Sequence, residues 1–350
     1  MMGGGKGLFV TRNRTTRALF VLGMGAALAF WCPAVAAPPR PAAQPPAAAP
    51  ATQPAPKNVL LISWDGMDRT VLKELLEANR LPHLAAIIKE GSLQAIEVTG
   101  HTTDTMPGHA QMLTGLDPRT SGVVTNHVYQ PIPEGYTIFE RVQKHLGKDA
   151  VRTVLVASKT DRLGGRGPGE YATDDAASRK GEPYFLTKKH LDVFDAETRR
   201  ADQTGPLALK YLAQFKPAAG AAWPRFLCFV HFADPDAAGH AFRSNSAEYR
   251  AAAVACDEAL GSIVDFLKKE KLYDDTRIYV TADHGFDKNA NSHNRAPSIF
   301  LATNDKAVTK GGTQADVPAT ILQRFGVDLS TLKPPLIGKP LTATGAALTK

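Results

Sequence analysis

Short apolar runs alternate with amphipathic segments along most of this 350-residue chain. Runs rich in Val, Ile, Leu and Phe are typical of strands that are buried on both faces of a sheet. They cover residues 59–63, 151–157, 226–232, 276–281 and 298–302. Segments with helical periodicity cover residues 71–79, 84–89, 138–146, 196–215, 247–268 and 317–325. This alternation predicts an α/β fold, a three-layer sandwich in which a central, mostly parallel sheet has helices on both faces.

The start of the chain follows a different pattern. Residues 1–36 combine a positively charged beginning, a short apolar stretch and the small-residue sequence Ala-Val-Ala. This order is typical of a secretory signal peptide cleaved near Ala36/Ala37, and an uncleaved N-terminal anchor is the alternative. Residues 37–57 are mostly Ala, Pro and Gln, which predicts a disordered linker. We therefore expect a periplasmic or secreted protein, with no membrane span in the mature chain and a folded domain over residues 58–345.

The net charge changes once this leader is set aside. The formal charge is +7, but residues 1–36 carry four cations and no acid, so their removal leaves +3. So small a charge, with no basic run, gives no evident surface for nucleic acid. Cleavage would also leave only two cysteines, Cys228 and Cys256, and the sequence does not decide whether they pair.

Carboxylates and imidazoles follow several of the predicted strands. In a parallel sheet, the carboxyl ends of the strands meet at one edge, where ligands gather. Three Asp and three His at one edge suit two divalent cations with three protein ligands each, leaving positions open for substrate and water. The candidate metal ligands are Asp65, Asp236, His240, Asp283, His284 and His293.

A threonine-rich segment supplies a candidate nucleophile. Pro107 suits the first turn of a helix, and Gly115 is a natural stop at its C-terminal end. Thr105 then lies at the helix N-terminus, where free N–H groups and the helix dipole favour an anion. The alternative is that Thr105 is only the N-cap of that helix.

Taken together, these motifs resemble the alkaline phosphatase superfamily, and most of all its type I phosphodiesterase and nucleotide pyrophosphatase branch. The resemblance spans residues 58–341 and includes the nucleophile motif Thr-Met-Pro-Gly-His at 105–109. It implies an alkaline phosphatase-like catalytic domain over residues 58–345, with a cap or insertion around 127–190. It also implies that Asn126 contacts a phosphate oxygen. One metal would take Asp236, His240 and His293, and the other Asp65, Asp283, His284 and Thr105.

Some features depart from the branch. Diesterases often carry Asn where this chain has Gly108, and the short interval from His284 to His293 is more similar to phosphopentomutases. Lys159 and Arg162 follow the strand at 151–157, where some monoesterases of the superfamily grip a dianionic phosphate. A solvated charged loop is the alternative for these two cations.

The resemblance implies a metal-dependent hydrolase of phosphate esters that acts on a small-molecule substrate through a phospho-threonine intermediate. A phosphate monoesterase is the alternative, and a phosphomutase or a non-catalytic binding relative fits less well. The mixed Asp and His ligands favour two Zn²⁺ ions, with Mn²⁺ as the second choice. His231 fits no ligand pattern, and we expect it to be structural or exposed.

Overall fold

The computed structural model describes residues 56–170, 176 and 178–343. The chain divides into two units, Met1–Ala48 and Ala49–Lys350, and every described residue belongs to the second. The predicted signal peptide and nearly all of the predicted linker therefore lie outside the described residues. Within the described part of the chain, no helix is both long and apolar enough to cross a membrane.

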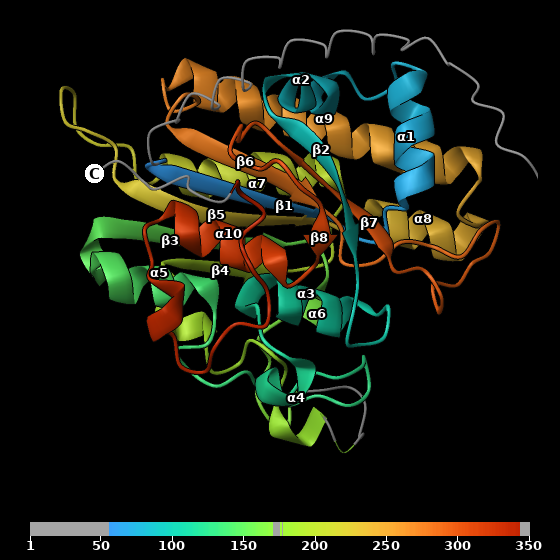
Figure 1. Cartoon of the computed structure of the whole chain (residues 1–350), viewed down its shortest axis with the longest axis horizontal. Coiled ribbons are helices and arrows are strands. Elements are labelled where there is room, and N and C mark those ends of the chain that lie inside the picture. The colour runs from blue at the N-terminus through green and yellow to red at the C-terminus, as the bar shows by residue number, and fades with distance from the viewer. Residues whose placement is uncertain (1–55, 171–175, 177, 344–350) are drawn as a thin grey trace, which may run out of the picture. The chain divides into compact units, whose positions relative to one another are not determined.

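An eight-stranded sheet forms the middle of the described unit, with strand order β4-β3-β5-β1-β6-β7-β2-β8 (Figure 1). The strands are β1 (Asn58–Trp64), β2 (Ser92–Glu97), β3 (Val151–Ala157), β4 (Val193–Ala196), β5 (Arg225–Phe232), β6 (Thr276–Thr281), β7 (Ser298–Thr303) and β8 (Gly312–Thr313). The first five strands in this order run parallel, and β7 is antiparallel to both of its neighbours. The predicted central, mostly parallel sheet is confirmed.

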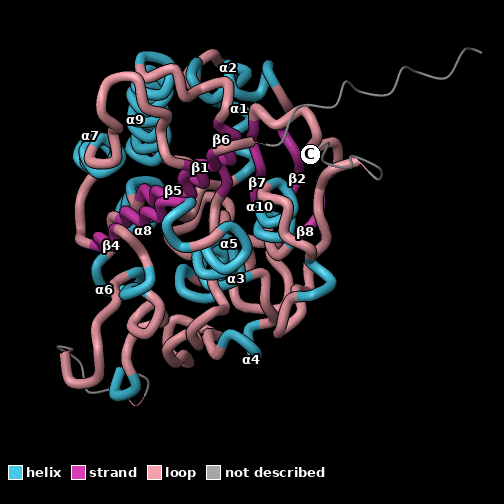
Figure 2. Tube along the Cα trace, turned by 90° about the vertical axis from the view of Figure 1, so that its left-hand side faces the viewer, coloured by secondary structure: helices cyan, strands magenta, loops and turns pink. Residues whose placement is uncertain are grey.

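Helices cover both faces of this sheet. They are α1 (Arg69–Glu77), α2 (Pro82–Glu90), α3 (Thr105–Thr114), α4 (Pro118–Ser121), α5 (Ile138–Leu146), α6 (Thr160–Leu163), α7 (Ala201–Ala213), α8 (Asp234–Phe242), α9 (Ala247–Lys269) and α10 (Asp316–Arg324). Helices α1, α2, α7 and α8 pack around α9 on one face, and α3, α5 and α10 pack together on the other (Figure 2). The three-layer arrangement is therefore as predicted.

The strongest apolar runs form the centre of the sheet. Every residue of β1 is buried, as is every residue of β5 after its first, because helices cover both faces. The predicted helix at 196–215 is wrong at its start, since Val193–Ala196 is strand β4 and α7 begins at Ala201. Pro206 lies inside α7 without ending it. Cys228 and Cys256 are both buried and free, so they form no disulfide.

The range 127–190 contains two kinds of structure. Helix α5 and strand β3 lie in this range and belong to the sandwich. From Gly164 to Leu191 the described chain is irregular apart from two short 3₁₀ turns, Ser178–Lys180 and Lys188–His190. That a cap over the site lies around 127–190 remains a prediction.

Candidate functional site

Strands β5, β1 and β6 are neighbours, and their carboxyl ends lie at one edge of the sheet. Asp65 follows β1 directly, Asp236 lies in the first turn of α8 just after β5, and Asp283 lies two residues beyond β6. The backbone N–H of Gly66 donates to Asp283 Oδ1 at 3.0 Å and joins two of these loops. The parallel order of the strands thus brings the three predicted carboxylates to one place, and all three are buried.

The first predicted ligand group, Asp236, His240 and His293, is brought together. Asp236 and His240 are four residues apart on α8, with Nε2 of His240 3.3 Å from Oδ1 of Asp236. Nε2 of His293 is 3.2 Å from Nε2 of His240. Each histidine points its Nδ1 at a backbone carbonyl, of Asn291 and Thr103 respectively, so Nδ1 carries the proton in the neutral ring. Two lone pairs then face each other, which is an arrangement that a cation satisfies.

The second predicted group, Asp65, Asp283 and His284, is also brought together. Nε2 of His284 is 3.5 Å from Oδ1 of Asp65, 3.4 Å from Oδ2 of Asp283 and 4.0 Å from Oδ1 of Asp236. His284 directs its Nδ1 to the carbonyl of Gly285, which leaves Nε2 as the acceptor. The donor atoms of Asp65, Asp236 and His284 all lie within 4.8 Å of one another, so the two predicted sites adjoin.

Four of these donor atoms are buried without a hydrogen-bond partner among the described residues. They are Oδ1 of Asp65, Oδ1 of Asp236, Oδ2 of Asp283 and Nε2 of His284. A buried polar atom without a partner is costly, and this number in one cluster requires an explanation. Divalent cations would satisfy all four atoms, so the residues present fit the predicted metals.

The charges of the cluster also favour bound cations. Burial opposes the ionisation of Asp65, but the Lys159 ammonium and His231 outweigh it and hold the pKa of Asp65 well below its usual value. Burial and the charge of Asp65 raise the pKa of Asp283 to about 7. One ammonium therefore does not compensate the carboxylates fully, and further positive charge is needed to ionise Asp283 completely at neutral pH.

Thr105 is the first residue of helix α3, and its side chain is buried. The N-cap position belongs to Asp104, and at the other end Gly115 adopts the left-handed conformation, as predicted. The backbone N–H of Met106 donates to Oδ1 of Asn126 at 2.9 Å, so Asn126 supplies the capping oxygen. That bond leaves the Nδ2 group of Asn126 as a donor beside the helix N-terminus. The alternative that Thr105 serves as the N-cap thus loses its support.

Lys159 lies within the cluster rather than in a solvated loop. Its Nζ is 2.7 Å from Oδ2 of Asp65, 2.5 Å from Oδ2 of Asp236 and 3.3 Å from Oγ1 of Thr105. Lys159 therefore contacts Oδ2 of Asp65 and Oδ2 of Asp236, whereas Oδ1 of each carboxylate is without a partner. Its ammonium thus joins one carboxylate of each predicted metal site. Arg162 instead donates from Nη1 to the backbone carbonyl of Asn126 at 3.2 Å.

Sequence reasoning missed the role of His231. It is fully buried in β5, and its Nε2 lies 2.8 Å from Oδ2 of Asp65. The backbone N–H of Ser158 donates to Nδ1 of His231, so the neutral ring must carry its proton on Nε2 and donate it to Asp65. The only signal in the sequence is one histidine near the end of an apolar run. Its partner lies 166 positions earlier in the chain.

Gly108 departs from the diesterase pattern for a steric reason. A Cβ built on Gly108 would lie 2.8 Å from the backbone oxygen of Asp283 and 2.9 Å from its Cβ. No side chain fits at this position unless the loop after β6 moves. The first turn of α3 therefore packs directly against the backbone of a predicted metal ligand.

Comparison with known proteins gives consistent matches. The model of the family described as type I phosphodiesterase / nucleotide pyrophosphatase matches residues 59–324. Among curated proteins, the bis(5'-adenosyl)-triphosphatase enpp4 of Mus musculus is 24% identical over 232 residues, which cover 65% of this chain and 47% of the relative. The chain spans about half the length of the curated relatives it matches.

Solved structures show the same fold. The murine ectonucleotide pyrophosphatase / phosphodiesterase 5, solved as an inactive variant with AMP, has a TM-score of 0.54 at 16% identity, covering 77% of this chain and 95% of that one. The alkaline phosphatase of the Antarctic bacterium TAB5 has a TM-score of 0.51 at 14% identity, covering 79% of this chain and 99% of that one. These likenesses confirm the predicted alkaline phosphatase-like fold.

Proposed function

Because this chain belongs to the type I phosphodiesterase / nucleotide pyrophosphatase family of the alkaline phosphatase superfamily, we propose that it hydrolyses phosphate esters with two divalent metal ions and a phospho-threonine intermediate. The family match agrees with the predicted class of enzyme, a phosphoric ester hydrolase. The observation that carries the proposal is the cluster of four buried donor atoms without partners around the N-terminus of α3.

In this proposal Thr105 is the nucleophile. Its Oγ1 attacks phosphorus, the P–O bond to the leaving group breaks, and water later releases the phosphate from the threonine. The N-terminus of α3 and the Nδ2 group of Asn126 stabilise the non-bridging oxygens as their charge shifts. When bound, the metal ions lower the pKa of the threonine hydroxyl and neutralise the leaving oxygen. Asp236, His240 and His293 would hold one ion, and Asp65, Asp283 and His284 the other.

Zinc is the proposed metal. Half of the six ligands are imidazoles that present Nε2, which suits Zn²⁺, whereas three carboxylates keep Mn²⁺ as the alternative. Metal analysis of the purified protein should find about two divalent ions per chain. Retention of both ions in both His240→Ala and Asp283→Ala would contradict this assignment of ligands.

The class of ester follows from two observations that point in different directions. The family model and the name of the curated relative favour diesters and dinucleotides. The ammonium of Lys159, 3.3 Å from Oγ1 of Thr105, favours a dianionic monoester. We propose a phosphodiesterase or nucleotide pyrophosphatase, with a monoesterase as the second candidate.

One experiment tests the activity and the class together. The rates of hydrolysis of 4-nitrophenyl phosphate and of its methyl diester are compared on metal-loaded protein and again after chelation. We expect hydrolysis of at least one ester, its loss on chelation and its return with added metal. Hydrolysis that continues unchanged in thoroughly stripped protein would overturn the proposal.

The location of the protein is also proposed from its sequence. The pattern of residues 1–36 supports export to the periplasm or the medium, with cleavage near Ala37. N-terminal sequencing of the exported protein should begin near that residue. An intact Met1 on protein recovered from the cytoplasm would contradict it.

A further inference from the structure

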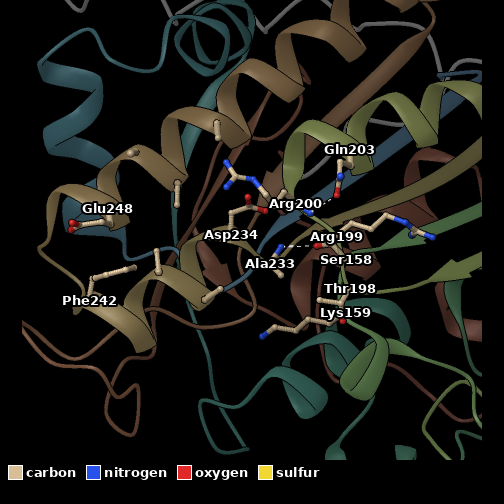
Figure 3. Close-up of a pocket in the computed structure, with 15 residues that line it drawn as sticks. Ser158, Lys159, Thr198, Arg199, Arg200, Gln203, Ala233, Asp234, Phe242 and Glu248 are labelled. Atoms are coloured by element: carbon tan, nitrogen blue, oxygen red, sulfur yellow. Dashed lines mark hydrogen bonds between the residues drawn. The ribbon is translucent and has the colours of Figure 1, made fainter.

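A pocket of about 730 Å³ lies beside the candidate site (Figure 3). Helix α8, the N-terminal half of α9 and the N-terminus of α7 surround it, together with the loops after β3 and β4. Much of its wall consists of methyl groups on the two helices, Ala237, Ala238, Ala251, Ala252 and Ala255. Because alanine side chains are so short, the helices leave an open space between them.

The remaining lining also favours an apolar occupant. Phe242 lines the pocket with 54% of its surface exposed, one of the few large apolar side chains exposed in the described part of the chain. Asp234 already accepts the backbone N–H of Ala201 at 2.9 Å, and Ser158 donates its hydroxyl to the carbonyl of His231 at 2.9 Å. Both groups therefore already have a partner within the protein. Gln203 and Glu248 add polar side chains at the lining, but most of the surface that a ligand would contact is hydrocarbon.

The cations of the lining do not form an anion clamp. The guanidinium of Arg199 is bound by Asp195 and Glu197, each at 2.7 Å, and Figure 3 shows it turned away from the space beside Phe242. The side chain of Arg200 is largely exposed, and its Nε lies 3.7 Å from Oδ1 of Asp202. If phosphorus of the substrate lies at Thr105, a further phosphate group in this pocket would meet no buried, unpaired arginine.

Lys159 connects the pocket to the nucleophile. Its side chain lines the pocket and extends beneath helix α8 in Figure 3, and its Nζ ends 3.3 Å from Oγ1 of Thr105. Asp234 and Asp236, two residues apart on α8, point to different sides of this helix, Asp234 towards the pocket and Asp236 towards the cluster of metal ligands. The pocket and Oγ1 of Thr105 are thus separated by about the length of the Lys159 side chain.

We propose that this pocket receives the organic group of the phosphate ester, and that this group is an apolar one such as an alkyl chain. The inference rests on the proposed function, because it places phosphorus at Thr105. The pocket sets the substrate class by burying hydrocarbon, so affinity should rise with chain length. Full burial of each added methylene corresponds to a gain of up to about fourfold.

Alkylphosphonates are suitable inhibitors for testing this inference. Each carries a single organic group, and the protein cannot hydrolyse its bond to phosphorus. Their inhibition constants are measured for methyl-, butyl- and hexylphosphonate against whichever 4-nitrophenyl ester the protein hydrolyses. In the natural protein, hexylphosphonate should inhibit at least tenfold more tightly than methylphosphonate. In Ala252→Leu and in Ala255→Leu, which fill the pocket with a good helix former, this ratio should fall towards one.

The control is Ala213→Leu, at the exposed end of α7 and outside the pocket, which should keep the natural ratio. A ratio near one in the natural protein, or a natural ratio in both pocket variants, would overturn the inference even if ester hydrolysis is normal. Tighter inhibition by AMP than by hexylphosphonate, lost in the pocket variants, would also overturn it and assign the pocket to a nucleoside. Absence of any ester hydrolysis would instead overturn the proposed function.

Discussion

The donor atoms of the candidate site are oriented by bonds on their far sides. His240, His284 and His293 each direct Nδ1 to a backbone carbonyl, which leaves Nε2 as the acceptor. Asp65 and Asp236 use one oxygen for Lys159 and keep the other without a partner. Such bonds fix the ring orientation and the free oxygen before a metal arrives.

Lys159→Met should therefore destabilise the metal-free protein more than the loaded protein. Removal of the ammonium leaves the carboxylates of Asp65 and Asp236 buried and uncompensated, which costs on the order of 3–5 kcal/mol. Added metal supplies the missing charge, so the loss in melting temperature should shrink in the loaded protein. Lys57→Met, which breaks an exposed ion pair with Asp275, is the control and should cost less than about 1 kcal/mol. Equal small losses for Lys159→Met with and without metal would contradict this role.

His231→Leu should weaken metal binding by about 10- to 100-fold, because Asp65 loses the donor that orients it. His231→Gln should recover most of that loss, since its amide nitrogen can donate where Nε2 of the imidazole did. Affinity is measured by competition with a chelator of known strength. If the leucine variant binds metal as tightly as the natural protein, His231 is merely a packing residue.

At the scale of elements, helix α3 places Thr105 and at the same time packs against the loop after β6. Gly108→Ala should displace Asp283, because the new Cβ would lie 2.8 Å from the backbone oxygen of that residue. Overpacking of this kind costs about 1–3 kcal/mol, and metal content should fall with it. Gly205→Ala in α7, whose new Cβ would meet the Cβ of Ala259 at 3.2 Å, should leave metal content unchanged. Full metal content in Gly108→Ala would show that the contact is not required.

The irregular segment after α6 carries a pH-dependent contact. Burial raises the pKa of Glu182 to about 7. Arg166 and Lys188 lower this pKa, and the charge of Asp161 raises it, but burial has the largest effect. A carboxyl whose pKa is raised on folding stabilises the fold most at low pH, and that contribution falls as pH rises from about 4.5 to 7. Glu182→Gln should remove this dependence. The melting temperature of the natural protein should thus fall relative to the variant over this range and level off above it. A constant difference between the two proteins would contradict the prediction.

The sequence predicted the elements whose signal is local. The buried strands at the centre of the sheet and the helix that begins near Thr105 have clear apolar runs or end signals. Strands β2, β4 and β8 were not predicted, because they are short or lie near the edges of the sheet and depend on partners distant in the chain. The bond between His231 and Asp65 was missed for the same reason, since it depends on the register of β1 against β5. Likewise, only the folded structure places Lys159 between two carboxylates.

At the scale of the whole molecule, the candidate ligands come from positions between 65 and 293 and meet only in the folded chain. Strands β1, β5 and β6 form the frame, and the segments that follow them, including helix α8, supply the donors. Metals that bind only the folded state should therefore stabilise the whole described unit. The apolar pocket, which helix α8 shares with α7, α9 and the loops after β3 and β4, lies beside the same edge of the sheet.

The turnover of fully metallated Thr105→Ala decides whether Thr105 is the nucleophile. If Thr105 is the nucleophile, the rate should fall by several orders of magnitude, whereas melting should change little because the N-cap position belongs to Asp104. Thr105→Ser keeps a hydroxyl and should retain appreciable activity. Metal content is measured in each variant, because Thr105 is proposed to touch one ion. Near-normal turnover by Thr105→Ala with both metals bound would show that Thr105 is not the nucleophile and require direct attack on phosphorus by water.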